Sequence, residues 1–184
     1  HAASLSLHVH TMSITLSSAS LPVFQTALSN LLHCLNKAEA NAVARKFDPN
    51  VLFAARLAPD MLPFAAQIRI ACDAAKNGTA RLAGIEAPKF DDNETTFAEL
   101  QARITKTLDW LATVPASAID GREDADITFP VGRDKTRTMK GEAYLKHYAL
   151  PNLFFHVVTA YALLRHNGVD VGKTDYLVGA QAVA

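Results

Sequence analysis

The chain has 184 residues, of which 49% are hydrophobic and 20% are charged, so its composition is that of a globular protein and not of a disordered one. Eighteen lysines and arginines balance eighteen aspartates and glutamates, and no basic stripe interleaved with aromatic residues occurs, which argues against a nucleic acid partner. The length suits a single domain, which we expect to cover residues 12–180.

Cys34 and Cys72 are isolated thiols without a CxxC spacing. They indicate neither a disulfide framework nor a thiolate zinc site. Free thiols of this kind are typical of proteins in the reducing cytoplasm, where we expect this protein to be located. The longest apolar run, residues 151–168, is interrupted by polar residues and is shorter than the roughly 20 residues of a membrane span, so no membrane partner is expected. Residues 1–11 precede Met12, and we interpret them as a remnant of expression or a disordered arm whose histidines form no metal site.

Four helices are predicted in chain order, at residues 22–45, 60–84, 94–114 and 142–168, and the last should bend at Pro151. Apolar residues recur in these segments at steps of three and four, the period of an amphipathic helix. In the first helix the apolar face consists of Phe24, Leu28, Leu31, Leu35 and Ala38.

Residues 126–141 have a different pattern, because Ile127, Phe129 and Val131 alternate before a run of turn residues. This alternation predicts a short β-hairpin or an irregular insert before the last helix. Pro130 cannot donate a ladder hydrogen bond, which favours an edge position. Taken together, the elements predict an all-α fold, a four-helix bundle with a small hairpin.

A polar line runs along the last helix, where Tyr148, Asn152, His156 and Thr159 are spaced by four, four and three residues. Bundles build metal and ligand sites from such inward groups, and imidazole is a common metal ligand. A metal site normally needs three protein ligands, and only His156 is a strong one. Alternatively, His156 is a buried histidine bonded to a backbone carbonyl or to Gln67.

The segments "LPNLFFHVVTAYALLRHNGV", "ARLAPDMLPFAAQIRIACDAAKNGTARLAG" and "TFAELQARI" resemble an uncharacterised bacterial family, the DUF1993 group, within the DinB/YfiT-like superfamily of four-helix bundles. The resemblance covers residues 12–177. It implies a divalent metal held by one histidine of the second helix and two histidines, four residues apart, on the last helix. His156 matches one of them, whereas the other two positions fall on Asn152 and near Gln67. An amide oxygen is a poor ligand for zinc or nickel, so the resemblance implies a weak or lost site.

We therefore expect a DinB-like protein that binds a small molecule and holds no metal, or a weakly bound zinc or nickel ion at His156. The expected central polar pocket consists of Gln67, Tyr148, Asn152, His156, Thr159 and Asp60. One alternative from the resemblance is a divalent-metal-dependent, thiol-using transferase or isomerase, or a hydrolase-like enzyme, in which Asp60 on the second helix helps His156 to hold a cation. A second alternative is a homodimeric interaction module, since related bundles pair through an apolar helix face.

Overall fold

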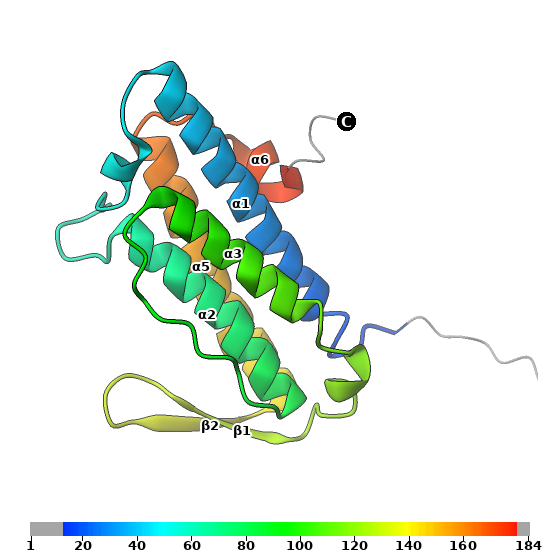
Figure 1. Ribbon diagram of the computed structural model, residues 1–184. Helices are drawn as coiled ribbons and strands as arrows, with labels where there is room; N and C mark the ends of the chain where they lie inside the picture. The colour runs from blue at the N-terminus through cyan, green and yellow to red at the C-terminus, as the bar shows by residue number, and fades with distance from the viewer. Residues whose placement is uncertain (1–12, 180–184) are drawn as a thin grey trace, which may run out of the picture.

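Residues 13–179 are described by the computed structural model, so the interpretation of residues 1–11 and the two ends of the expected domain lie outside the described residues. The predicted four-helix bundle with a hairpin before its last helix is confirmed (Figure 1). Within the bundle, α2 packs against α3 and α5, and α1 packs against the same two helices. The helices are α1 (Leu21–Ala44), α2 (Phe64–Ala83), α3 (Phe97–Leu111), α4 (Gly141–Tyr144), α5 (Leu150–His166) and α6 (Lys173–Val178). The other elements are β1 (Asp126–Pro130), β2 (Thr136–Lys140), the 3₁₀ turns η1 (Pro49–Leu52) and η2 (Ala116–Ala118), and the π-helical turn η3 (Leu145–Ala149).

The core is one cluster of apolar side chains, and the face predicted for the first helix is buried in it. Gly78 brings α2 close to its neighbours, because a Cβ atom there would lie 3.4 Å from Phe24 Cζ and 3.6 Å from the Ala149 Cβ. The space at position 78 therefore accommodates a methyl group and little more. Among residues 13–179, no helix is both long and apolar enough to cross a membrane.

The predicted start of the second helix is wrong. The helix begins at Phe64, after Pro63 in extended geometry, and Asp60 lies exposed in the preceding loop. Its end is marked by Gly84, whose φ of 67° is the left-handed conformation that glycine adopts without strain. The third helix is also shorter than predicted, because Thr96 and Glu99 form a capping box at its start.

The last helical segment is continuous from α4 through η3 to α5, and the irregularity predicted at Pro151 is a π turn directly before it. The Leu150 amide bonds to the Leu145 carbonyl, five residues back, in place of the usual four. Pro151 lacks an amide hydrogen and would leave one carbonyl of a regular helix without its partner. The wider turn therefore occurs where the α-helical ladder is already interrupted, and it rotates the residues before Pro151 relative to those after it.

The hairpin closes the end of the bundle near the last turns of α2 (Figure 1). Its strands are antiparallel, with Ile127 opposite Met139 and Phe129 opposite Arg137. Ile127 and Phe129 are buried, as their alternation predicts, and Phe129 packs on the rings of two tyrosines in α4 and η3. The hairpin thus supplies one wall for the side chains that lie between α2 and the last helix.

The short helix α6 was not predicted, and it lies against α1 (Figure 1). Asp175 attaches it there, since its carboxylate accepts from Lys37 Nζ at 3.0 Å and lies 2.9 Å from His33 Nε2. Partial burial would raise the pKa of Asp175, but the amide of Gly172 and these two side chains outweigh it and hold the pKa at about 2. The Asn30 side chain adds a hydrogen bond to the Tyr176 carbonyl at 2.9 Å.

Candidate functional site

One polar contact joins α2 to α5 through Gln67 and His156. His156 Nδ1 lies 2.8 Å from Gln67 Oε1, and Gln67 Nε2 donates to the Leu62 carbonyl at 3.0 Å. Because the amide nitrogen is committed to Leu62, the amide oxygen accepts, and Nδ1 carries the imidazole proton. Gln67 is 2% exposed and His156 is 9% exposed, and burial lowers the pKa of His156 below 6.5. His156 is therefore a neutral, buried histidine bonded to Gln67, as one of the two sequence interpretations expected.

These residues do not fit the divalent metal site that the family resemblance implies. The oxygen of Gln67 already accepts from His156, and Asn152 offers only a second amide. Asp60 is not on α2 as expected, because the helix starts at Phe64 and Asp60 lies exposed in the loop before it. Within residues 13–179, no group of three or more histidine, cysteine, aspartate or glutamate side chains could hold a metal ion.

Tyr148 and Asn152 lie in a different place from this pair. Both line a pocket of about 190 Å³ between α2, the segment from α4 to α5, and the end of β1, which we call the α2–α5 pocket. Its polar lining consists of Asp73, Asn77, Arg81, Tyr144, Tyr148 and Asn152. Neither Gln67 nor His156 lines it. The expected central pocket is therefore divided into a closed hydrogen-bonded pair and an open pocket.

Aromatic rings and one guanidinium group form a wall of the α2–α5 pocket. Tyr144 and Tyr148 line the pocket, and the buried Phe129, which does not line it, packs on their rings at centroid distances of 4.9 Å and 4.3 Å. Arg81 Nη1 donates to the Tyr144 hydroxyl at 3.1 Å, and its guanidinium lies 5.8 Å from the Phe129 ring. Burial raises the pKa of Tyr144, so this phenol stays protonated. The wall combines flat apolar surface with hydrogen-bond donors.

Sequence reasoning missed the contribution of α2 to this pocket. Asp73, Asn77 and Arg81 are spaced by four residues each, so they form a polar line on one face of the helix. This polar spacing on the second helix predicts an inward-facing polar line in the same way as the spacing of Tyr148, Asn152 and His156 does on the last helix. Conversely, Thr159 was predicted in the pocket but is not part of its lining, and its hydroxyl donates to the Phe155 carbonyl of its own helix at 2.6 Å.

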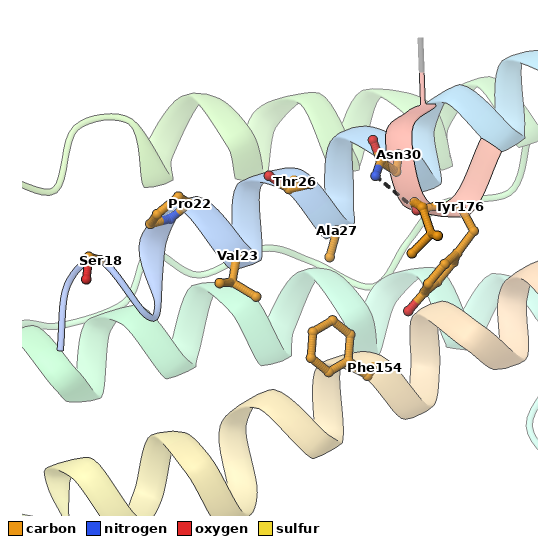
Figure 2. A pocket seen from close by; sticks show the side chains of 9 residues that line it. Ser18, Pro22, Val23, Thr26, Ala27, Asn30, Phe154 and Tyr176 are labelled. Carbon is orange, nitrogen blue, oxygen red and sulfur yellow. Dashed lines mark hydrogen bonds between the residues drawn. The ribbon is translucent and has the colours of Figure 1, made fainter. Parts of the chain in front are cut away.

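A second concave surface is an apolar groove of about 350 Å³ among α1, α5 and α6 (Figure 2). Figure 2 shows Val23 and Ala27 of α1 on one side of this groove, with Phe154 of α5 and Tyr176 of α6 facing them. The groove exists because α6 docks on α1, so it depends on the Asp175 contacts described above.

Comparisons with known proteins agree with this architecture. The family described as a domain of unknown function, DUF1993, matches residues 16–177. A crystal structure of a DinB family member protein from Shewanella denitrificans is 43% identical in sequence, with a TM-score of 0.80, over 88% of this chain and 91% of that one. Among curated proteins no match is found. The chain therefore belongs to the DUF1993 family, whose fold here is that of the DinB proteins.

Proposed function

We propose that this protein binds a small organic molecule in the α2–α5 pocket and that its binding does not depend on a metal. The observation that carries the proposal is the convergence of aromatic rings, a guanidinium group, a phenol and two amides on one pocket of about 190 Å³. Ligand sites are typically concave, with apolar or aromatic walls and a few polar groups that orient the ligand.

The polar groups of the pocket support this proposal because some of them have unused hydrogen-bonding capacity. The side chains of Asn77 and Asn152 make no hydrogen bond with any residue in the described part of the chain, although both line the pocket. An amide offers two donors and one acceptor, so these groups can bind a ligand without breaking protein contacts. The segments that carry them are helices packed into the core, which keeps the groups in place.

A thermal-shift screen of small polar and aromatic compounds tests this function. A compound that binds only the folded protein raises the melting temperature. We expect the shift to be lost in Asn152→Ala and kept in Asn93→Ala, which changes an exposed asparagine outside the pocket. Shifts that are equal in both variants would place the binding site elsewhere.

We propose that the protein binds no metal, or at most a weakly bound zinc or nickel ion at His156. The donor set supports this, because Gln67 and Asn152 supply amides where strong ligands would be needed. Elemental analysis of protein that lacks residues 1–11 should find well under one metal ion per chain. Stoichiometric metal that His156→Ala removes would instead favour the divalent-metal-dependent, thiol-using transferase or isomerase, or hydrolase-like enzyme. The two buried, unpaired cysteines support our proposal of a cytoplasmic location.

A second candidate function is self-association as a homodimer. Val158 of α5 and Leu177 of α6 are exposed and line a common shallow pocket, Leu177 also lines the apolar groove, and Phe155 of α5 is exposed as well. Gathered apolar side chains of this kind are typical of interaction surfaces. Sedimentation should detect a dimer that Val158→Glu dissociates, whereas a chain that stays monomeric at high concentration would remove this candidate.

A further inference from the structure

Arg81 is a cation of the α2–α5 pocket that has no carboxylate partner. Within residues 13–179 it makes no ion pair, and its one hydrogen bond goes to the neutral hydroxyl of Tyr144. Only Nη1 is used there, so the N–H groups of Nε and Nη2 remain for another acceptor. A partly buried guanidinium that faces a pocket without its counter-charge favours an anionic ligand.

The Tyr144 hydroxyl also favours an anionic ligand. It accepts from Arg81, so its own proton is left for a second acceptor, and no described residue provides one. The residue is 1% exposed, and its side chain forms part of the pocket lining. A buried hydroxyl proton without an acceptor is costly, and an oxygen of a bound anion would satisfy it together with the guanidinium.

The one acidic side chain of the pocket does not cancel this preference. Asp73 Oδ1 lies 3.1 Å from Lys76 Nζ and 3.2 Å from Arg103 Nη2, so two cations already compensate its charge. The other polar lining groups are neutral amides and phenols. Arg81 is therefore the charged group of the lining whose charge is not already balanced.

We propose that the α2–α5 pocket takes a small carboxylate with a flat apolar body, held by Arg81 and the Tyr144 hydroxyl. The planar guanidinium fork matches the two oxygens of a carboxylate. The body of the ligand lies against the ring of Tyr148, which lines the pocket and is itself packed on the buried Phe129 ring, 4.3 Å away between centroids. The volume of about 190 Å³ limits the ligand to roughly six water volumes, about the size of one aromatic ring with its carboxylate. This inference rests on the proposed small-molecule function.

Three probes of one shape test the charge class: benzoate, benzamide and benzylammonium. Titrations followed by NMR on the ¹⁵N-labelled full chain report the side-chain signals of Asn77, Asn152 and Arg81. We expect benzoate to bind most tightly and to shift all three. In Arg81→Met its dissociation constant should rise roughly tenfold or more, because a hydrogen bond to a charged group contributes that much. Arg165→Met, with the same charge change on an exposed arginine, should leave binding unchanged.

Two further variants keep the test decisive if Arg81→Met does not fold. Arg81→Lys keeps the charge but loses the fork, and Tyr144→Phe keeps the ring but loses the hydroxyl. Each should weaken benzoate and leave benzamide unchanged. If benzamide, benzylammonium or inorganic phosphate binds the pocket as well as benzoate does, the carboxylate class is wrong while the small-molecule function stands. If no compound of a broad fragment set shifts the pocket signals, the proposed function is wrong, and this inference with it.

Discussion

The hydrogen bond between His156 and Gln67 predicts how much stability the substitution His156→Leu removes. Leucine takes away the donor of Gln67 Oε1, and the Gln67 side chain is too buried, at 2% exposure, for water to replace that donor. A buried acceptor without its partner costs about 1–3 kcal/mol. We expect the free energy of unfolding to fall by about 2 kcal/mol, which for a chain of this length lowers the melting temperature by roughly 4–8 °C.

A double-mutant cycle isolates the hydrogen bond from other effects of the substitution. Gln67→Leu alone leaves the His156 donor unpaired, whereas the double variant removes both polar groups together. The double variant should therefore be more stable than the sum of the two single losses predicts, by about 1 kcal/mol. Urea unfolding, followed through the fluorescence of Trp110, the one tryptophan of the chain, measures all four proteins. If the losses in unfolding free energy of the two single variants simply add in the double variant, the hydrogen bond does not stabilise the protein.

The pH dependence of stability gives an independent check. The pKa of His156 is lowered by burial in the folded protein, so the unfolded chain binds a proton more readily below its own pKa of 6.5. The contribution of neutral His156 to stability is therefore fully present above pH 6.5, and it is lost as the pH falls from there towards the lower pKa of the folded state. The wild type should lose more stability than His156→Leu does between about pH 7.5 and about pH 5.5. An equal loss in both proteins would contradict the buried, neutral imidazole.

Three other predictions follow from contacts elsewhere in the molecule. Asp175→Asn should speed amide hydrogen exchange in α6, and the wild-type helix should lose the same protection as the pH falls from 3.8 towards about 2. Gly78→Ala should change the unfolding free energy little, whereas Gly78→Val should lower it by about 1–3 kcal/mol through contact with Phe24; equal effects would contradict the tight packing. Cys34 and Cys72, whose pKa values burial raises to about 11 and about 12, should not react with a thiol reagent near pH 8 until the protein unfolds.

Local sequence patterns were enough to predict the helices and the hairpin. The spacing of apolar residues such as Phe24 and Leu28 depends only on the helical repeat, and the alternation of Ile127 with Phe129 depends only on the strand repeat. Helix ends were less accurate. At Asp60, a good capping residue is present, but the chain continues as a loop to Phe64. The six-residue helix α6 is too short for a period to appear in the sequence.

The sequence by itself determined the fold class, the family and the choice of polar residues on the last helix. Only the tertiary structure decided which of those residues meet. Gln67 faces His156 because α2 packs against α5 in one register, and no local pattern contains that register. The π turn before Pro151 changes the helical phase of Tyr148 relative to His156, which a regular repeat of 3.6 residues cannot anticipate. The partners Arg81 and Tyr144 lie 63 residues apart in the chain and become a pair only by packing.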